Sequence, residues 1–284
     1  MVTILDGKTL AKKMTTTLKQ RVAALQQQQI QPKFAVIIAG TDPASEIYLR
    51  NKVRRAERLG IEVAVFRFPA NVTATTLIQQ IQQLNQDAAI HAIMLEMPLP
   101  KQLDSQTIIA AIDPAKDADG IHPLNLGRIL TGQPGLLPNT PYGIMQLLQA
   151  YQIPLVGANA VVVGRSTIVG KPIAALLTNQ HATVTLAHSR TKDLTGLLQQ
   201  ADLIVAATGQ PEWLHANAVK AGAVVIDVGM NQNAAGQLVG DVAYDDVAAK
   251  AGAITPVPGG VGPMTNVMLM TQIVALAEGS QANA

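Results

Sequence analysis

The feature that most constrains the fold is a repeated alternation of short β-branched runs with longer helical patterns. The first series contains the runs FAVII (34–38), IEVAVF (61–66) and AIMLEM (92–97), separated by helical patterns at 44–59 and 73–85. The second contains AVVVG (160–164), ATVTLA (182–187), DLIVAA (202–207) and AVVID (223–227), with a helical pattern at 170–178. Such alternation is typical of parallel strands joined by crossover helices. The sequence therefore predicts an α/β fold built from two such series.

The alternation lapses between residues 113 and 141, where proline, glycine and aspartate are frequent. A chain of 284 residues has room for about two domains, at roughly 150 residues per domain. We therefore expect a first domain formed by residues 1–138 and 265–284, and a second formed by residues 139–264. The last helical pattern, at residues 264–277, is expected to return to the first domain.

Composition argues against several classes of partner. Lysine and arginine together number 21 and aspartate and glutamate 19, so the basic surface that holds a nucleic acid is not expected. Two uncharged stretches, 138–164 and 251–277, are broken by proline and glycine into pieces too short to span a membrane. The N-terminus lacks the pattern of a secretory signal. We predict a cytoplasmic protein with no nucleic-acid and no membrane partner.

Cysteine is absent, which excludes disulfides, thiolate ligands and cysteine nucleophiles. The five histidines show neither the HxxxH nor the HxH spacing typical of metal ligands. Asp113, Asp117 and Asp119 could gather around a cation, but carboxylates beside prolines serve turns and helix caps equally well. We predict no metal site.

A candidate nucleotide-binding turn follows the apolar run 160–163. It begins at Gly164 and passes through Arg165 and Ser166 to Gly170, where a helical pattern starts. A strand, a glycine turn and a helix N-terminus together form an anion site, because free backbone N–H groups and the helix dipole face the phosphate. Ser166 stands where the common dinucleotide motif has its second glycine, and Gly170 falls one residue late. A purely structural turn is therefore an equal alternative from this motif alone.

The end of the next predicted strand favours NADP over NAD. In NAD-binding units an acidic residue about 20 positions after the motif binds the ribose 2′-hydroxyl, whereas a 2′-phosphate needs basic and hydroxyl groups. Here the sequence reads His188-Ser189-Arg190-Thr191 without a carboxylate, and Arg165 adds a second guanidinium. For either arginine alone, a solvated surface charge is the default explanation. Together they predict NADP as the cofactor.

A second candidate site lies on the first crossover helix. Ser45, Tyr48 and Lys52 fall at positions i, i+3 and i+7, so all three project from one face near the end of a strand. Ligands of open α/β sheets bind at strand ends. From spacing alone, a solvated polar stripe is the more common explanation of such a pattern.

Three flanking motifs support a functional interpretation of that helix. Glu96-Met97-Pro98-Leu99-Pro100 ends the third predicted strand, and Lys116-Asp117-Ala118-Asp119-Gly120 opens the lapse between the domains. Both place ionisable groups where a cleft is expected. The third motif, Pro258-Gly259-Gly260-Val261-Gly262-Pro263, has few side chains and lets backbone approach a ligand closely. A plain linker into the last helix is its alternative explanation.

At these residues the chain resembles the bifunctional methylenetetrahydrofolate dehydrogenase/methenyltetrahydrofolate cyclohydrolase family. The motifs that carry the resemblance follow the family's order and spacing across nearly the whole chain. They are PASEIYLRNKVRRAERLGI (43–61), MPLP (97–100), KDADGIHPLNLGR (116–128), TPYGI (140–144), VVVGRSTIVGKP (161–172), HSRT (188–191), DVGMN (227–231), GDV (240–242) and PVPGGVGPMT (256–265). The resemblance implies two α/β domains facing across a cleft, the second of them Rossmann-like and binding NADP. It also implies that the C-terminal helix returns to the first domain, and that a homodimer forms through the NADP domains.

The resemblance further implies roles for individual residues. Lys52 corresponds to the general acid/base, Tyr48 to a residue that stacks on and orients the folate ring, and Asp119 to a hydrogen-bond partner of the pterin. The remaining positions divide between the two ligands. The implied substrate contacts include Ser45, Pro258, Gly259 and Gly260, and the implied cofactor contacts are Gly164, Arg165, Ser166, Ser189, Met230 and Thr140.

The implied chemistry has two steps. A hydride passes from the methylene carbon of 5,10-methylenetetrahydrofolate to NADP, and water then opens the methenyl product to 10-formyltetrahydrofolate. The residues fit this, because hydride transfer needs mainly positioning and hydrolysis needs a group that carries a proton.

Glu96 departs from the family pattern, which has a glutamine at this position beside the lysine. A carboxylate there favours the ammonium form of Lys52 and opposes a base that must act without its proton. We therefore expect Glu96, which we count among the catalytic residues, to weaken hydrolysis more than hydride transfer. The alternative is a protonated Glu96 that mimics the amide.

Two other functions compete with this interpretation. The chain could bind folate and NADP without catalysis, although Tyr48, Lys52 and Asp119 are all retained. It could also be an NADP-dependent dehydrogenase for another small substrate, which would leave the motifs of the first domain unexplained.

Overall fold

The structure is a computed structural model of the chain and describes residues 2–40 and 43–279, with the side chains of residues 43–45 and 48 outside this description. The chain divides into two compact units. Unit 1 contains Met1–Lys13 and Pro138–Met268, and unit 2 contains Met14–Leu137 and Leu269–Ala284. The helices α1 (Gly7–Gln27) and α10 (Val261–Ala277) therefore contribute residues to both units.

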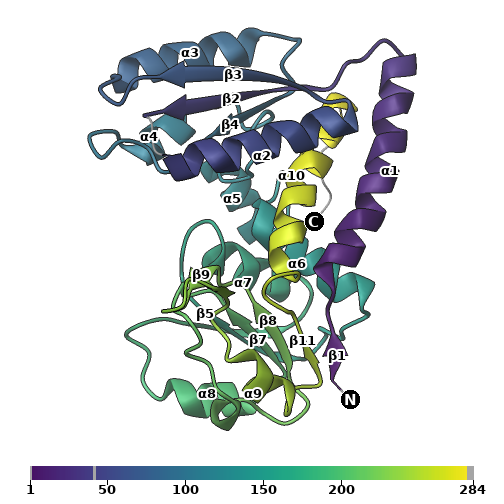
Figure 1. The fold of residues 1–284 in the computed structure, drawn as a ribbon, viewed down its shortest axis with the longest axis vertical. Coiled ribbons are helices and arrows are strands. Elements are labelled where there is room, and N and C mark those ends of the chain that lie inside the picture. Colours follow the sequence, from purple (N-terminus) through teal and green to yellow (C-terminus); the bar gives the residue numbers. More distant parts are fainter. Residues whose placement is uncertain (1, 41–42, 280–284) are drawn as a thin grey trace. The chain divides into compact units, whose positions relative to one another are not determined.

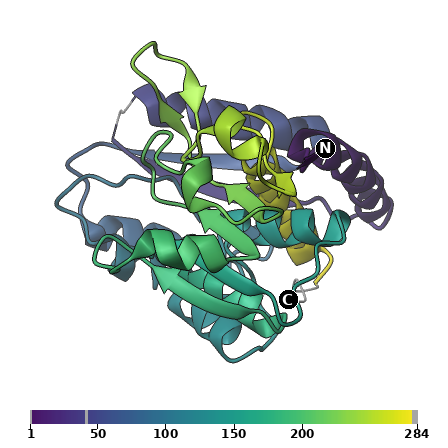
Figure 2. The same cartoon turned by 90° about the horizontal axis from the view of Figure 1, so that it is seen from below.

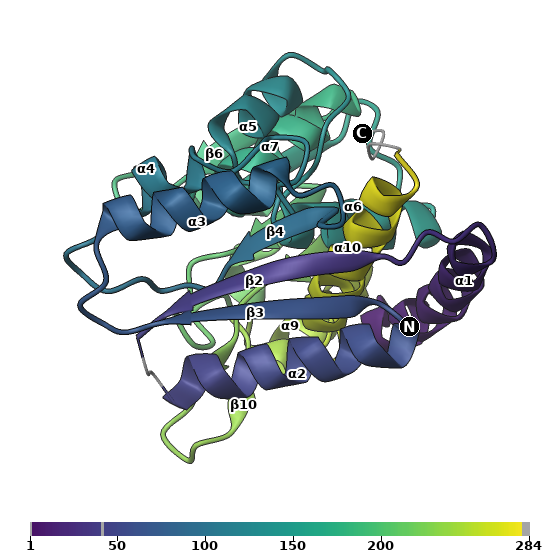
Figure 3. The same cartoon turned by 90° about the horizontal axis from the view of Figure 1, so that it is seen from above.

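Unit 2 is built around a three-stranded parallel sheet in the order β3-β2-β4. Its strands are β2 (Lys33–Ala39), β3 (Glu62–Phe68) and β4 (Ala92–Leu95). The sheet lies between α2 (Pro43–Leu59) and α3 (Ala74–Gln86), as Figures 1 and 3 show. The central strand β2 and its neighbour β4 are almost wholly buried, which explains why both read as continuous apolar runs in the sequence.

Alternate residues of the sheet pack against α3. Ala35 and Ile37 of β2 share a buried cluster with Leu77 and Ile81 of α3. Two short helices follow β4, namely α4 (Ser105–Ile109) and α5 (Pro123–Leu130). The helix α5 begins at a proline, and the side chain of His122 accepts a hydrogen bond from the N–H of Leu124. Proline at the first helical position removes an N–H that would otherwise lack a partner.

The C-terminal helix α10 completes unit 2. Gln272 of α10 is fully buried, accepts a hydrogen bond from the N–H of Leu137 at 2.9 Å, and donates to the carbonyl oxygens of Leu137 and Ala118. The predicted return of this helix to the first domain is confirmed, because its residues from Leu269 onward belong to unit 2.

Unit 1 contains a six-stranded parallel sheet in the order β1-β11-β8-β7-β5-β6. Its strands are β1 (Thr3–Ile4), β5 (Asn159–Val163), β6 (Thr183–Ala187), β7 (Leu203–Ala206), β8 (Val224–Asp227) and β11 (Ala253–Ile254). From β5 the chain passes to β6 on one side and then to β7 on the other. This reversal is the topological switch point, the place where α/β sheets bind their ligands.

The helices wholly within unit 1 are α6 (Asn139–Ala150), α7 (Gly170–Asn179), α8 (Leu194–Gln200) and α9 (Tyr244–Ala248), with a 3-10 turn η1 at Ala216–Ala218. Antiparallel strands β9 (Asn231–Gln232) and β10 (Leu238–Val239) form a small hairpin that extends away from the sheet, as Figure 2 shows in yellow-green. The predicted α/β class with parallel sheets is confirmed.

Residues 1–13 belong to unit 1, where β1 pairs in parallel with β11, and α1 continues from them without a break into unit 2. The chain leaves unit 2 at Leu137, within the predicted lapse. That lapse also contains α5, a helix that the sequence pattern did not predict. None of the helices that the structure describes combines the length and hydropathy needed to cross a membrane.

Candidate catalytic pair and cofactor pocket

The catalytic-site prediction centres on Lys52 and Glu96, and the structure brings these two side chains together. The Nζ of Lys52 donates hydrogen bonds to both carboxylate oxygens of Glu96, at 2.8 and 3.0 Å. Glu96 is only 5% exposed and the lysine side chain 25%. A carboxyl group removed from water in this way needs close hydrogen-bond partners, and the Nζ of Lys52 is the partner of both oxygens.

The local fold positions both members of the pair. The backbone N–H of Glu96 donates to the carbonyl oxygen of Ile37, which extends the sheet one residue beyond β4. Lys52 lies between Leu49 and Ala56, two buried residues on the same face of α2. Its aliphatic stem therefore starts from the packed face of the helix while the ammonium reaches the end of the sheet.

The other predicted residues of this site are less fully described. Ser45 and Tyr48 lie on α2, but their side chains are outside the described part of the chain. Asp119 is half-buried and follows the isolated bridge between Ile93 and Asp117.

Lys116 and Asp117, in the same motif, have structural partners. The Nζ of Lys116 donates to the carbonyl oxygens of Leu84 and Asp87 at the end of α3, and burial lowers the pKa of this lysine. The buried carboxylate of Asp117 accepts hydrogen bonds from the N–H of His122 and the amide of Asn125. Burial raises the pKa of Asp117. Lys116 and Asp117 therefore have structural roles in this motif.

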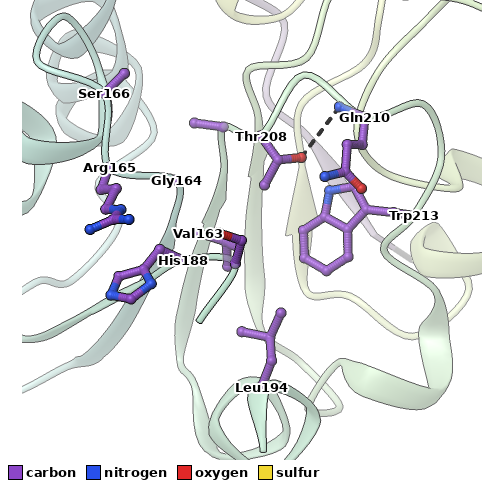
Figure 4. A pocket seen from close by; sticks show the side chains of 11 residues that line it. Val163, Gly164, Arg165, Ser166, His188, Leu194, Thr208, Gln210 and Trp213 are labelled. Atoms are coloured by element: carbon purple, nitrogen blue, oxygen red, sulfur yellow. Dashed lines mark hydrogen bonds between the residues drawn. The ribbon is translucent and has the colours of Figure 1, made fainter. Parts of the chain in front are cut away.

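A pocket of about 350 Å³ lies at the carboxyl ends of β5, β6 and β7, at the switch point of the unit 1 sheet (Figure 4). The predicted cofactor residues Gly164, Arg165, Ser166 and Ser189 all line it. The remaining lining residues are Val163, His188, Leu194, Ala207, Thr208, Gln210 and Trp213. The structure thus brings together four of the predicted cofactor contacts, which come from two turns about 25 residues apart.

The turn between β5 and α7 leaves no space for side chains at its two glycines. Gly164 has φ +121°, and a Cβ there would overlap the carbonyl oxygen of Ala207. A Cβ on Gly170 would overlap the carbonyl oxygen of Gly164. The hydroxyl of Ser166 accepts hydrogen bonds from the N–H groups of Val169 and Gly170, which fixes the turn at the start of α7. Gly164 is therefore needed for the close approach of the turn to the end of β7, and Gly170 for the close approach of α7 to the turn.

The charged side of the pocket is suited to an anion. Arg165 and His188 lie together on this side in Figure 4, and no carboxylate is among the residues that line the pocket in the described chain. Two hydrogen bonds between residues close in sequence close the turn 188–191. The N–H of His188 donates to the hydroxyl of Thr191, and the N–H of Arg190 donates to Nδ1 of His188. The guanidinium of Arg165 fits an anion such as a phosphate, which an acidic residue in the pocket would repel.

Asp241 fixes the opposite wall of the pocket. One of its carboxylate oxygens accepts three hydrogen bonds, from the N–H and hydroxyl of Thr208 at 2.6 and 2.7 Å and from the N–H of Gly209 at 3.1 Å. The other oxygen accepts from the side-chain amide of Asn231. Because Asp241 is fully buried and Thr208 lines the pocket, this carboxylate holds the turn after β7 in place.

A second buried carboxylate supports Asp241. Asp227, the last residue of β8, accepts hydrogen bonds from the backbone N–H groups of Gly229, Asp241 and Val242. Burial raises the pKa of Asp227 to about 6, and the neighbouring carboxylate of Asp241 acts in the same direction. The motifs DVGMN and GDV therefore form one network behind the pocket.

The other predicted ligand contacts of unit 1 lie outside the pocket lining. Met230 is 58% exposed, and its sulfur lies near Gly262. The hydroxyl of Thr140 shares a hydrogen bond with that of Thr265. Pro258, Gly259 and Gly260 form a turn in which the carbonyl oxygen of Gly259 accepts a hydrogen bond from the N–H of Lys8.

Sequence reasoning did not identify Leu194, Thr208, Gln210 and Trp213 as pocket residues. The signal that could have found the last three is their position directly after the run 202–207, since parallel strands bring their carboxyl ends to one edge. Within the described part of the chain, no three histidine, aspartate or glutamate side chains gather as metal ligands would.

Two family models match the chain. The catalytic domain of tetrahydrofolate dehydrogenase/cyclohydrolase matches residues 5–119, and the NAD(P)-binding domain of the same family matches residues 138–281. The bifunctional protein FolD of Ligilactobacillus salivarius is 51% identical over 282 residues, which is 99% of each chain.

Solved structures agree with these matches. The bifunctional FolD enzyme of Campylobacter jejuni has a TM-score of 0.97 at 42% identity, with 98% of this chain and 99% of that one covered. The Trypanosoma brucei FolD enzyme, whose structure is a complex with NADP cofactor and inhibitor, has a TM-score of 0.92 at 35% identity and 98% coverage of both chains. The chain belongs to the tetrahydrofolate dehydrogenase/cyclohydrolase family.

Proposed function

We propose that this chain oxidises 5,10-methylenetetrahydrofolate with NADP and hydrolyses the methenyl product to 10-formyltetrahydrofolate. The observation that carries the proposal is the buried pair of Lys52 and Glu96, which gives the folate-binding domain of this family member a proton-carrying amine at the end of its sheet. The carboxylate-free pocket of unit 1 supports NADP as the partner of that domain. Residues 1–138 with 265–284 are proposed as the folate domain, and residues 139–264 as the NADP domain.

The cofactor supplies one piece of chemistry, since bound NADP accepts the hydride released from the substrate's methylene carbon. The chain's own residues bind and orient it. The turn from Gly164 to Ser166 would hold the pyrophosphate at the N-terminus of α7. Arg165, His188 and Ser189 would hold the 2′-phosphate and ribose, and Thr140 and Met230 are proposed as further contacts.

Folate binding and proton transfer are assigned to the other predicted residues. Tyr48 would orient the ring system and Asp119 would accept hydrogen bonds from the pterin, with Ser45, Pro258, Gly259 and Gly260 as further substrate contacts. Lys52 would move a proton between water and the substrate during ring opening. To do so, its Nζ must give up a proton while it donates two hydrogen bonds to the carboxylate of Glu96.

That requirement favours a second candidate, a dehydrogenase with weak cyclohydrolase activity. Hydride transfer depends on positioning and is not slowed by an ammonium at residue 52, whereas a base must be uncharged to accept a proton. The two hydrogen bonds to Glu96 stabilise the ammonium and so disfavour hydrolysis selectively.

The test is a paired assay of NADPH formation and methenyltetrahydrofolate hydrolysis on the parent protein and Glu96→Gln. We expect the variant to raise the ratio of hydrolysis to hydride transfer by about tenfold, because the amide no longer holds the ammonium so strongly. Glu62→Gln, which changes an exposed ion pair with Lys33 in the same unit, is the matched control. An unchanged ratio would remove the role assigned to Glu96. Binding of both ligands without turnover by the parent would instead support a non-catalytic protein.

Assembly and location complete the proposal. We propose a homodimer formed through the NADP domains, as the family resemblance implies, and a cytoplasmic location. Light scattering of the purified protein tests the first, and a mass near twice 29.9 kDa is expected.

A further inference from the structure

In the part of the chain that the structure describes, one long edge of the unit 2 sheet has no neighbouring strand. β3 is seven residues long and pairs with β2 on one side only. The edge at β4 is shorter and partly covered, because Ile93 forms a parallel bridge to Asp117. The middle of β3, residues 63–66, contains neither proline nor charge, the features by which exposed edges usually avoid pairing. β3 is therefore the edge of this sheet that can accept a further strand.

The hydrogen bonds of β3 show which of its backbone groups are available. The N–H of Glu62 donates to the carbonyl oxygen of Pro32, directly before β2, so the even-numbered residues of β3 face β2. Backbone groups alternate in direction along a strand, and those of Val63, Val65 and Arg67 therefore point away from the sheet. Among the described residues, no backbone hydrogen bond outside the ladder with β2 involves these three.

The edge is open at its start, where a groove of about 580 Å³ lies. Its lining includes Val63 and Ala64 of β3 together with Gly60, which follows α2. This groove is at the amino ends of the strands, whereas Glu96 lies at the carboxyl end of β4. It therefore belongs to neither of the proposed ligand sites, and it leaves room for the end of an added segment.

The helix beside this edge carries a row of arginines. α2 packs against β3, and Figure 3 shows the two elements running alongside each other. Arg67 of β3 donates to the carboxylate of Glu46 in the first turn of α2, so the end of the strand lies by the start of the helix. Arg50, Arg54 and Arg58 recur every four residues along α2 and are all exposed. This arginine row therefore follows β3 in the opposite direction.

Folding alone does not account for the arginine row. Like charges four residues apart on a helix destabilise it. None of the three arginines forms an ion pair among the described residues, and the helix dipole favours only Arg58, which lies in the last turn. Glu57 is the only carboxylate of α2 besides Glu46. An anionic partner that neutralises the row would explain its presence.

The spacing of the arginines fits an extended chain. Four residues of an α-helix advance by about 6 Å. Alternate residues of a β-strand, whose side chains share one face, are about 7 Å apart. The bond between Arg67 and Glu46 shows that the odd-numbered side chains of β3 face α2. A strand added to β3 would therefore present every second side chain to the arginine row.

The other face of an added strand would meet apolar surface. Ala64, Phe66 and Phe68 are even-numbered residues of β3 and pack, partly buried, against the core that the sheet shares with α3. Apolar side chains on this face of the added strand would extend that core and gain from burial. The segment that fits this edge thus alternates acidic and apolar residues.

We propose that the free edge of β3 and the arginine row of α2 form a docking site for an extended acidic segment of another protein, which adds to the sheet as a strand. The inference goes beyond the proposed function and uses neither of its ligand sites. A second copy of the chain fits less well, because it would bring its own arginine row against this one. A nucleic acid would use the arginines alone, since it has no peptide backbone to pair with β3.

The test is fluorescence polarisation with a labelled synthetic peptide as long as β3, in which glutamate and valine alternate. We expect it to bind the full-length protein. Arg54→Gln/Arg58→Gln should weaken binding about tenfold, because charge-assisted contacts are lost at two positions. Lys13→Gln/Lys19→Gln, which removes the same charge from exposed positions of α1, is the matched control and should bind the peptide as the parent does.

Val65→Pro tests the strand pairing itself. The N–H of Val65 points away from the sheet, so proline removes a donor from the edge without removing a hydrogen bond to β2. We expect the variant to bind the peptide several-fold more weakly. A peptide with a fully N-methylated backbone keeps its charges but cannot donate, and we expect it not to bind the parent. Thermal unfolding shows whether each variant is folded, and the methylated peptide tests the pairing should the proline variant fail to fold.

Each other outcome contradicts the proposal in a different way. Equal binding of both peptides by the parent would mean that charge alone holds them, and full affinity in Arg54→Gln/Arg58→Gln would remove the arginine row. Displacement of the peptide by a single-stranded oligonucleotide would assign the row to a nucleic acid. A larger mass for the parent than for Val65→Pro in light scattering would make a second copy the occupant.

Failure of the alternating peptide to bind the parent would overturn the proposal outright. Hydride transfer by the parent, assayed on the same preparation, tests the proposed function separately. The docking variants are expected to retain that activity, because none of their positions belongs to either proposed ligand site.

Discussion

At the scale of single residues, the most unusual feature of this chain is a set of buried carboxylates, since acidic side chains usually lie on the surface. Among the residues that the structure describes, Glu96, Asp117, Asp227 and Asp241 are the buried acidic side chains. The last three accept hydrogen bonds from backbone or side-chain amide N–H groups, and Asp241 also accepts one from the hydroxyl of Thr208. Glu96 instead faces the ammonium of Lys52. Neutral dipoles suit a fixed structural role, whereas an ion pair can exchange a proton with a ligand.

Asp227 gives a prediction about pH and stability. Its carboxyl has a pKa of about 6 in the folded chain against 3.8 as the ordinary value, so the folded state binds its proton more tightly than the unfolded state does. The contribution of this group to stability is therefore complete below about pH 4 and is lost as the pH rises through about 6. We expect the loss to be on the order of 1–3 kcal/mol.

Urea unfolding of the parent and of Asp227→Asn, from about pH 4 to about pH 8, measures this effect. The asparagine resembles the protonated carboxyl and does not titrate. The difference in the free energy of unfolding between the parent and the variant should fall as the pH rises through this range. A difference that is constant or that grows with pH would contradict the raised pKa.

At the scale of elements, the strands of the core were predictable and the segments that join them were not. Buried parallel strands such as β5 read as unbroken β-branched runs, and Gly164 marks where that strand ends. The two-residue strands β1 and β11 have too little sequence to show a pattern. The helix α5 contains Gly127 and begins at Pro123, so its composition resembles a turn.

The candidate sites, like the elements, have some features that the local sequence shows and others that it does not. The turn at Gly164 and the absence of a carboxylate at residues 188–191 are local properties, and the sequence shows both. The bond between Asp241 and Thr208 joins residues 33 positions apart, and only the folded sheet brings them together. Local patterns therefore identify the charged side of the pocket, while the opposite wall depends on tertiary contacts.

Gln272 gives a prediction for an element, since it attaches α10 to unit 2. We expect Gln272→Leu to lower the free energy of unfolding by about 2–4 kcal/mol, because it leaves the buried N–H of Leu137 and two carbonyl oxygens without this partner. Urea unfolding measures the change. Gln79→Leu, at an exposed position of α3, is the control and should change stability by less than about 0.5 kcal/mol. A similar small effect for Gln272→Leu would show that the amide does not anchor the helix.

At the scale of the whole molecule, the two proposed ligand sites belong to different compact units. Lys52, Glu96 and Asp119 lie in unit 2, and the pocket at Gly164 lies in unit 1. Each unit has its own parallel sheet and its own buried core cluster. Each ligand is therefore expected to stabilise the unit that binds it.

Hydrogen exchange tests this division. Adenosine 2′,5′-bisphosphate should slow amide exchange at residues 164–170, 188–191 and 207–214, and tetrahydrofolate should slow it in α2 and at residues 96–100. The protein without ligand is the reference for both. Protection by the nucleotide in α2, with none at residues 164–170, would show that the pocket of unit 1 is not its site.

The order of residues along the chain has a consequence for synthesis on the ribosome. The folding unit that contains Lys52 begins early, at Met14, but includes Leu269 and the residues after it. Gln272, which binds Leu137 and Ala118, is therefore translated only after residues 138–268 of the nucleotide domain. While the nucleotide domain is being made, the folate domain of the nascent chain is incomplete. The carbonyl oxygens of Leu137 and Ala118 then lack the hydrogen bonds that the side-chain amide of Gln272 later donates. Premature termination near residue 268 would consequently leave the domain encoded first unfinished, although every residue of its predicted catalytic pair had been translated.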